Sequence, residues 1–160
     1  MTGSKKTQPK KTPAEKRKLA FQFFNEIGII QQLAATLFNR RLPEGLHVSH
    51  FAVLNHFVRL GDGKTPLALA SAFQVSKGTM THTLAALQGR GLIRLEPHAS
   101  DRRSKLVYIT EAGRAFHRQA IDSLEPLFAT LEAELDLDQV IAVLPVLSQV
   151  REVLDAKREI

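Results

Sequence analysis

The chain of 160 residues is 44% hydrophobic, has a formal net charge of +6 and contains no cysteine. Its length suits one domain with a hydrophobic core, or one small domain with additional helices, and the lack of cysteine excludes disulfides, thiolate metal sites and thiol chemistry. The N-terminus has no apolar core like that of a signal peptide, and no segment has about 18 uninterrupted apolar residues, so we expect a soluble, cytoplasmic protein.

The charges are segregated along the chain. Residues 1–18 carry seven basic and one acidic residue, and residues 19–58 carry two of each kind. Residues 59–118 carry ten basic and four acidic residues, whereas residues 119–160 carry three basic and nine acidic residues. A basic middle segment fits a polyanion partner, because clustered Lys and Arg release counterions from phosphates. An ordinary solvated face gives the same pattern, so charge alone does not distinguish a polyanion-binding surface from a solvated one.

The first helix is expected to follow a polar N-terminal segment. Residues 1–12 are rich in Lys and Thr, cannot bury enough apolar surface to order, and are interpreted as a disordered basic tail. From Pro13 to Arg41 the apolar residues recur at spacings of three and four, which predicts a helix. These residues are Leu19, Phe23, Phe24, Ile27, Ile30, Ala34, Leu37 and Phe38. Pro43 and Gly45 then break the pattern.

Three shorter helices are expected next. Ser49 is the predicted N-cap of a helix that ends at Gly61. Thr65 caps a short helix over 66–73 that begins with a proline at its first position. Ser76 caps a further helix that runs to about residue 88. The two short helices, joined by a turn of three residues, predict a helix-turn-helix.

A hairpin is expected after the helix-turn-helix. The runs "GLIRLE" and "KLVYI" are strand-like and are separated by the charged segment "PHASDRRS". They predict a two-stranded hairpin with a long tip. A helix-turn-helix followed by such a hairpin is a winged helix. The recognition surface in a major groove would then be the start of the second short helix, with the hairpin as a wing beside it.

The C-terminal part is expected to be helical. Thr110 and Glu111 start a helix with an apolar stripe that runs well beyond a winged-helix core. The stripe comprises Phe116, Ala120, Leu124, Leu127, Leu131 and Leu135. Asp136 or Asp138 caps a last helix. Pro126 and Pro145 lie inside the helical patterns and are expected to kink them.

This arrangement resembles the MarR family of transcription regulators over roughly residues 19–157. The segment "LASAFQVSKGTMTHTLAALQGRGLI" matches the family's helix-turn-helix pattern, and Asp101, Arg103, Ile109 and Thr110 match its wing pattern. Gln74 stands where glycine is common in the turn, so a left-handed backbone there would carry modest strain. His82 stands where arginine is common, which alters one contact to DNA.

The candidate contacts to DNA fall into two groups. The first is the start of the second short helix: Ser76, Lys77, Gly78, Thr79, Thr81 and His82. The second is the wing: Arg94, Asp101, Arg102, Arg103 and Lys105. Arginines of the wing could enter a minor groove or bind phosphates, with Asp101 positioning Arg103. The alternative without DNA binding is a capped, solvent-facing helix start for the first group and a solubilising loop for the second.

Other kinds of site find little support. His47 and His50 are three residues apart and His117 lies on a later helix, but this spacing is weak for a metal site, and neutral surface or capping histidines are commoner. No phosphate loop, serine elbow or matched carboxylate pair can be identified. We therefore predict no metal, no cofactor and no catalytic residues, and hence that the protein is not an enzyme.

The sequence thus predicts a mainly α fold with a small two-stranded β wing. Its parts are a tail over 1–12, an N-terminal dimerisation helix over 13–45, a winged helix-turn-helix over 46–110 and C-terminal dimerisation helices over 111–160. The predicted function is that of a homodimeric transcription regulator that binds a pseudo-palindromic DNA duplex. The resemblance further implies a repressor that is relieved by a small aromatic or anionic ligand. A winged-helix module that binds another protein is the alternative.

Overall fold

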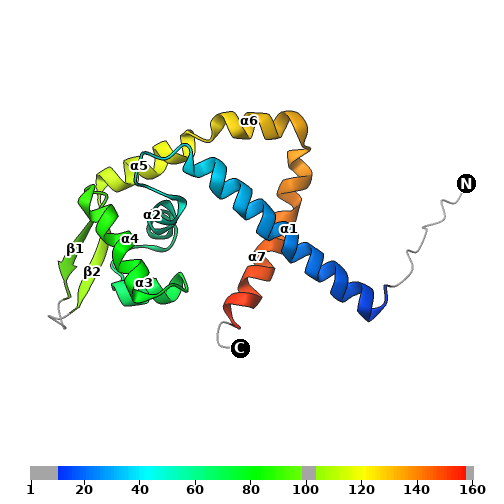
Figure 1. The fold of residues 1–160 in the computed structure, drawn as a ribbon, viewed down its shortest axis with the longest axis horizontal. Helices are drawn as coiled ribbons and strands as arrows, with labels where there is room; N and C mark the ends of the chain where they lie inside the picture. Colours follow the sequence, from blue (N-terminus) through cyan, green and yellow to red (C-terminus); the bar gives the residue numbers. More distant parts are fainter. Residues whose placement is uncertain (1–10, 99–103, 158–160) are drawn as a thin grey trace, which may run out of the picture. The chain divides into compact units, whose positions relative to one another are not determined.

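A computed structural model of the chain describes residues 11–98 and 104–157 (Figure 1). Within these residues lie seven helices and two strands: α1 (Pro13–Asn39), α2 (Val48–Leu60), α3 (Pro66–Ala72), α4 (Lys77–Gly89), β1 (Ile93–Pro97), β2 (Lys105–Ile109), α5 (Glu111–Asp122), α6 (Glu125–Glu134) and α7 (Leu137–Asp155). The predicted mainly α fold with a two-stranded wing is confirmed. The chain divides into two compact units after Val48. In the part that is described, no helix has the length and apolarity to span a membrane.

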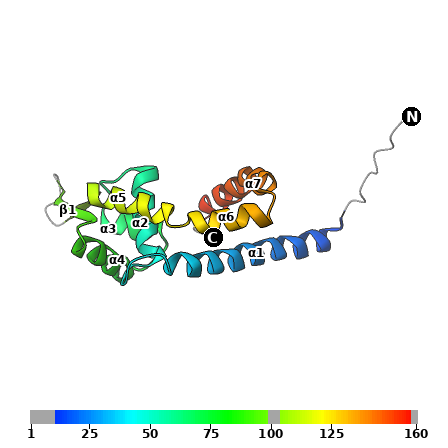
Figure 2. The same cartoon turned by 90° about the horizontal axis from the view of Figure 1, so that it is seen from above.

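Helix α1 begins at the predicted residue because a capping box precedes it. The Glu15 N–H donates to Thr12 Oγ1 at 3.3 Å, and the Thr12 N–H donates to Glu15 Oε2 at 2.7 Å. These bonds satisfy backbone donors that a helix start leaves open, and Pro13 needs none. The backbone and side-chain hydrogen bonds of Thr12 also lower the pKa of Glu15. Figure 2 shows α1 as one uninterrupted helix.

The start of α2 differs from the prediction. The helix begins at Val48, so Ser49 lies in its first turn and is not the N-cap. The Val48 N–H instead donates to the side-chain oxygen Oδ1 of Asn39 at 2.7 Å. The residue that satisfies this donor is nine positions upstream, at the last position of α1, and therefore outside the local spacing from which a cap is predicted.

The two short helices form the predicted helix-turn-helix. Thr65 Oγ1 accepts the Ala68 N–H at 3.1 Å at the start of α3, and Ser76 Oγ accepts the Thr79 N–H at 3.0 Å at the start of α4. In the turn between them Gln74 has a φ of +51°, in the left-handed region. The expected strain at this position is therefore present, because a Cβ disfavours that region.

The core of the second unit joins the helix-turn-helix to the wing. Leu54, Leu69, Leu87 and Val107 have no exposed surface, and they come from α2, α3, α4 and β2. The strands pair antiparallel, with Ile93 opposite Ile109 and Pro97 opposite Lys105. The segment before α3 adds one bridge to β2, because the Val107 N–H donates to the Lys64 carbonyl oxygen at 2.9 Å. Figure 1 shows the wing beside α4.

The C-terminal helices differ from the prediction in one respect. The helix expected from Thr110 to Leu135 is two helices, because α5 ends at Asp122 and α6 begins at Glu125. Pro126 cannot donate a bond to the carbonyl of Asp122 and is tolerated only in a first helical turn, so the kink expected there is a break. Pro145 lies inside α7, which continues past it. Asp136 caps α7 by accepting the N–H groups of Asp138 and Gln139.

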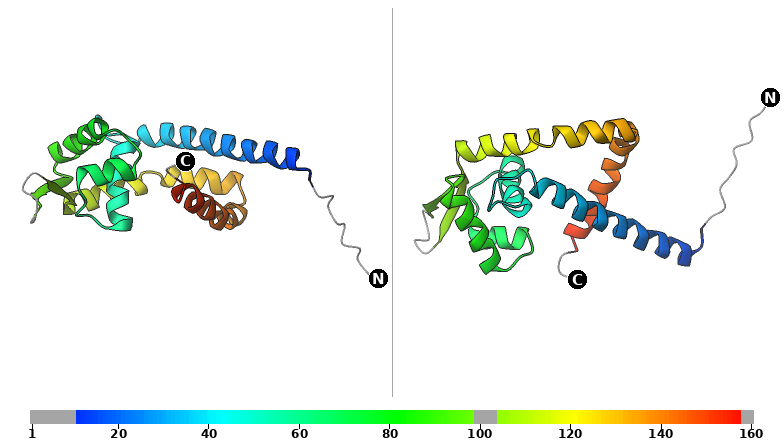
Figure 3. Two further views of the ribbon diagram at one scale, coloured as in Figure 1. Left: turned by 90° about the horizontal axis from the view of Figure 1, so that it is seen from below. Right: turned by 45° about the horizontal axis from the view of Figure 1, so that its top comes forward.

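Many large apolar side chains of α1, α6 and α7 remain exposed. In α1 they are Leu19, Phe21, Phe24, Ile29, Ile30, Leu33 and Leu37. In α6 and α7 they are Phe128, Leu131, Val140, Ile141, Val143, Leu144, Val146, Val153 and Leu154. Figure 3 shows α6 and α7 joined by a turn. Exposed apolar surface of this extent is typical of an interface between protein chains.

We expect Gln74→Gly to raise the free energy of unfolding by about 0.5 to 1 kcal/mol. Relief of a left-handed conformation is worth about 1 to 2 kcal/mol, and the added freedom of glycine in the unfolded chain offsets about half of it. Urea denaturation at fixed protein concentration measures the change. Gln74→Ala is the matched control, because it removes the exposed side chain but keeps the Cβ. Equal stability of the two variants would show that the turn is not strained.

Candidate nucleic-acid interface

The first turns of α4 expose every residue that was predicted to form the recognition surface. The exposed residues are Ser76, Lys77, Gly78, Thr79, Thr81 and His82. The opposite side of the helix is buried through Met80, Thr83, Leu84 and Leu87. Burial of that apolar side fixes the rotation of α4, so the polar side must face away from the core.

Hydroxyl groups on this surface are already held by the helix. Ser76 Oγ and Thr79 Oγ1 share a hydrogen bond of 2.8 Å, and the Thr81 hydroxyl donates to the Lys77 carbonyl oxygen at 2.8 Å. The Thr81 hydroxyl hydrogen is therefore engaged, while its oxygen can still accept and its methyl group is free to make contacts. Such a threonine can accept from the amino group of a base or pack on a thymine methyl group.

The helix-turn-helix carries an unusual charge pattern. The 33 residues from Gly63 to Leu95 contain four Lys or Arg residues and no Asp or Glu. The described carboxylates nearest to this segment in sequence each lie beside an arginine. Asp62 is 3.8 Å from Arg114 and Glu96 is 2.7 Å from Arg94. The segment that contains α3 and α4 therefore carries only positive or neutral side chains, which suits a polyanion.

The wing places two of its five predicted residues on the described strands. Arg94 and Lys105 are exposed on β1 and β2. The Arg94 Nε–H donates to Glu96 Oε1, and its guanidinium lies 5.0 Å from the centre of the Tyr108 ring. Asp101, Arg102 and Arg103 lie outside the described residues. Glu96 and Tyr108 were missed by the sequence analysis, although the spacing of Arg94 and Glu96 by two residues indicates a shared strand face.

Asp62 is a second residue that the sequence analysis missed. Its Oδ2 accepts the Ile109 N–H at 3.1 Å and lies 3.8 Å from Nη2 of Arg114. One carboxylate thus connects the segment before α3, the end of β2 and helix α5. A single aspartate in a Gly-Asp-Gly sequence carries no signal for these long-range contacts, which only the fold brings together.

Two histidines in the second unit have pKa values below the ordinary value for histidine. Burial, followed by the charge of Arg118, lowers the pKa of His117. The His117 ring stacks on Phe51 and its Nε2 lies 3.1 Å from Asn55 Oδ1. Burial, followed by Lys64 and Arg59, lowers the pKa of His56. Of the histidines considered for a metal, His50 and His117 are buried and His47 is exposed, and no metal-binding group of three or more appears within 11–98 and 104–157.

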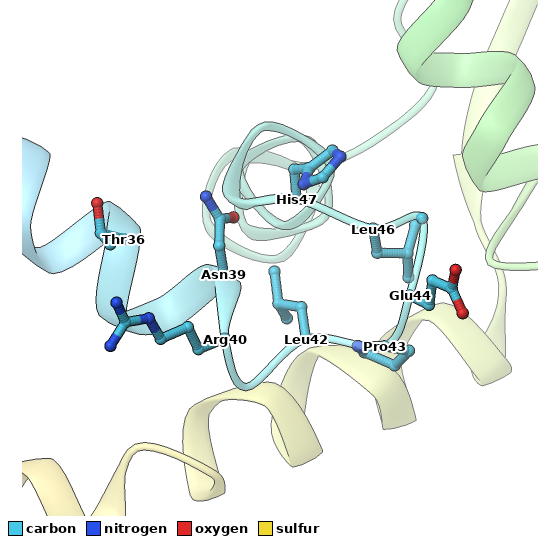
Figure 4. Close-up of a pocket in the computed structure, with 9 residues that line it drawn as sticks. Thr36, Asn39, Arg40, Leu42, Pro43, Glu44, Leu46 and His47 are labelled. Carbon is cyan, nitrogen blue, oxygen red and sulfur yellow. The ribbon is translucent and has the colours of Figure 1, made fainter.

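A hollow of about 430 Å³ lies where α1 ends (Figure 4). It is lined by Thr36, Asn39, Arg40, Leu42, Pro43, Glu44, Gly45, Leu46 and His47. Figure 4 shows the side chains of Arg40 and His47 directed away from one another. The Arg40 guanidinium and the His47 ring therefore do not converge on one point of this hollow.

The helix-turn-helix, the flanking hairpin and the exposed start of α4 define a winged helix-turn-helix protein. Residues 44–104 match the family model described as "MarR family". A cysteine-to-serine mutant of MarR from E. coli is similar to this chain with a TM-score of 0.67 and 27% sequence identity, over 79% of this chain and 93% of that chain. The chain is thus similar to MarR-family regulators in its winged helix-turn-helix region, and the resemblance drawn from the sequence is confirmed.

Two further solved structures are similar to this chain. The same E. coli mutant complexed with operator DNA has a TM-score of 0.64 and 27% identity, over 81% of this chain and 93% of that one. The regulator PcaV from Streptomyces coelicolor, in complex with its natural ligand, has a TM-score of 0.61 and 21% identity, over 79% and 89%. The two E. coli structures support a DNA-binding transcription regulator. The similarity to PcaV shows a shared fold.

We expect the free energy of unfolding to fall as the pH is lowered below 6.5, the ordinary pKa of histidine. The folded pKa values of His56 and His117 lie below this value, so the unfolded chain binds protons first and acidification favours unfolding. Well above this pH both states are neutral and the contribution is constant. Urea denaturation across this range, at fixed protein concentration, measures the slope.

The double variant His56→Gln, His117→Gln is the control for this pH dependence. Because glutamine does not titrate, the slope of stability against pH should be smaller than in the wild type, whatever the absolute stability. An unchanged slope would assign the dependence to other groups.

Proposed function

We propose that the protein is a homodimeric, sequence-specific transcription regulator that places the start of α4 in the major groove of duplex DNA. The observation that carries this proposal is the exposed first part of α4, which presents small polar side chains and one lysine within a segment free of carboxylates. A helix start of this kind can approach base edges closely, while Lys77 can bind phosphate. The similarity to MarR bound to operator DNA supports it.

The wing supplies a second group of contacts in this proposal. Lys105 and Arg94 are exposed on its strands, and the tip carries Arg102 and Arg103 in sequence. These side chains would bind phosphates or enter the neighbouring minor groove, with Asp101 positioning Arg103. Such contacts fix the register of the protein on the duplex, whereas α4 reads the bases.

A homodimer accounts for the exposed apolar surface of the terminal helices. The exposed fractions of Phe21 and Ile30 on α1 are 74% and 62%, and that of Ile141 on α7 is 57%. Burial of each such side chain in an interface stabilises the dimer by about 1.5 to 3 kcal/mol before the cost of association. A two-fold dimer carries two copies of α4, which suits a pseudo-palindromic operator.

Repression that is relieved by a small aromatic or anionic ligand completes the proposal. Its support is the family resemblance and the structure of PcaV with its natural ligand. The hollow at the end of α1 is large enough for a small molecule, although the side chains of Arg40 and His47 do not converge on it. A ligand that binds the DNA-free form more tightly would release the operator by mass action.

We expect the wild type to select a two-half-site duplex from a random library and to bind it with a steep salt dependence. Each neutralised phosphate contributes a slope of about −0.9 in a plot of log affinity against log salt. Lys77→Ala should weaken binding to selected and random duplexes alike and reduce the slope by about one contact. Thr81→Ala should weaken binding to the selected duplex by about 1 to 3 kcal/mol and leave random-duplex affinity unchanged.

Fluorescence anisotropy with labelled duplexes measures these affinities. Alanine is a strong helix former, so Thr81→Ala keeps α4 intact and separates loss of contact from loss of structure. Failure of the library to yield any preferred duplex, together with a shallow salt dependence, would favour a winged-helix module that binds another protein.

We expect deletion of residues 137–160 to give a monomer or an aggregate with much weaker operator binding. The deletion removes α7 and its exposed apolar side chains, which the proposed dimer buries. Sedimentation velocity measures the mass, and circular dichroism checks that the remaining helices are folded. A soluble truncated protein that binds a two-half-site duplex with full affinity would contradict the role of α7 in the dimer.

A further inference from the structure

Three side chains meet on the outer face of the wing. Arg94 on β1 lies opposite Tyr108 on β2 in the strand register, and Glu96 follows two residues later on the same face. The Arg94 Nε–H donates to Glu96 Oε1 at 2.7 Å, while the guanidinium carbon lies 5.0 Å from the centre of the Tyr108 ring. The arginine is thus held by a carboxylate at one edge and by an aromatic ring on one face.

The Tyr108 ring is itself fixed from below. A Cβ atom built on Gly63 would lie 3.2 Å from Cε1 of Tyr108, so the ring covers a residue that has no side chain. The backbone of that segment is bonded to β2, because the Gly63 N–H donates to the Val107 carbonyl oxygen at 2.8 Å. Gly63 has a φ of +74°, which glycine adopts without strain. The ring that lies against Arg94 therefore belongs to the hydrogen-bonded part of the wing.

The bond to Glu96 leaves most of the arginine available. A guanidinium has five N–H donors, and Glu96 accepts only the one on Nε. The two terminal NH₂ groups can still bind an anion, and two of their N–H bonds match two oxygens of a phosphate. The pair is also accessible, since the side chains of Arg94 and Glu96 are 54% and 46% exposed.

We propose that Glu96 and Tyr108 are positioning residues that hold Arg94 ready to bind a DNA phosphate. This inference rests on the proposed function and assigns roles to two residues beyond the candidate contacts. A free arginine loses side-chain entropy on binding, a cost on the order of tenfold in affinity that a held arginine has largely met beforehand. The Glu96 carboxylate also repels phosphate, but across water this costs only about two- to threefold.

The sign of the effect separates positioning from repulsion. Glu96→Ala should weaken binding to the selected duplex by about 3- to 10-fold, although it removes a negative charge from the interface. Glu96→Gln should bind as tightly as the wild type or up to about threefold tighter, because its carbonyl oxygen still accepts the Nε–H and the repulsion is gone. If Glu96 only repels DNA, both variants bind more tightly and to the same extent.

A second background tests whether Glu96 acts through Arg94. In Arg94→Ala, which should itself weaken binding by about 5- to 100-fold, Glu96 has no arginine to hold. Adding Glu96→Ala there should leave affinity unchanged or raise it by up to about threefold. Weakening by the same factor as in the wild type would show that Glu96 does not act through Arg94, and would overturn the inference.

A matched control removes a carboxylate elsewhere on the same lobe. Glu111 on α5 lies 3.6 Å from Arg118, and its side chain is 82% exposed. Glu111→Gln should change affinity for the selected duplex by no more than about twofold, in the direction of tighter binding. Weakening by Glu111→Gln as large as that by Glu96→Ala would assign the loss to general destabilisation of the lobe.

A spectroscopic measurement without DNA tests the restraint itself. The ¹⁵Nε–H resonance of Arg94 should be resolved and slow to exchange with solvent in the wild type and in Glu96→Gln, and should lose both properties in Glu96→Ala. A wild-type resonance that exchanges as fast as those of exposed arginines would overturn the inference. Absence of wild-type binding to any duplex would overturn the proposed function as well, whereas wild-type binding that Glu96→Ala leaves unchanged would overturn only the inference.

Discussion

The winged lobe is held together at Gly113, where helix α5 passes the backbone at the end of α4 with no side chain between them. A Cβ atom on this residue would overlap the carbonyl oxygen of Leu92 and crowd the side chain of Ile109. Thr110, just before α5, donates its hydroxyl to the Gly91 carbonyl oxygen at 2.6 Å and its N–H to the Leu92 carbonyl oxygen at 3.1 Å. The segment that connects α4 to β1 and the end of β2 are therefore joined at one place, and neither can shift without the other.

Local chemistry explains why most helix boundaries could be predicted from the sequence. Thr12, Thr65, Ser76, Thr110 and Asp136 all cap helices in the structure. A cap works through hydrogen bonds within three residues, so its signal is contained in the adjacent sequence. The prediction of Ser49 as an N-cap was wrong, because the Val48 N–H is bonded to Asn39 at the end of the preceding helix. The break before Pro126 was underestimated, since the apolar stripe continues across it at helical spacing.

The candidate site likewise has features that the sequence predicts and features that only the fold reveals. The exposed side of α4 could be predicted because helical periodicity places Met80, Leu84 and Leu87 in the core and leaves the remaining positions outside. The contact of Arg94 with Tyr108 could not be predicted from the sequence, because the register of a hairpin depends on its tip. A register shift of one residue would move each side chain of the strand to the opposite face of the sheet. The contacts of Asp62 with Ile109 and Arg114 likewise arise only when segments far apart in sequence are folded together.

Tyr108 is the single tyrosine of a chain that contains no tryptophan. When the protein is excited at a wavelength that its nine phenylalanines do not absorb, Tyr108 is its one fluorescent side chain, and it lies in the wing against the Arg94 guanidinium. Its emission reports the surroundings of one ring, with no background from the core or the terminal helices. Departure of the arginine from that ring, or a change in its exposure to water, can thus be followed in the unlabelled protein on the time scale of mixing.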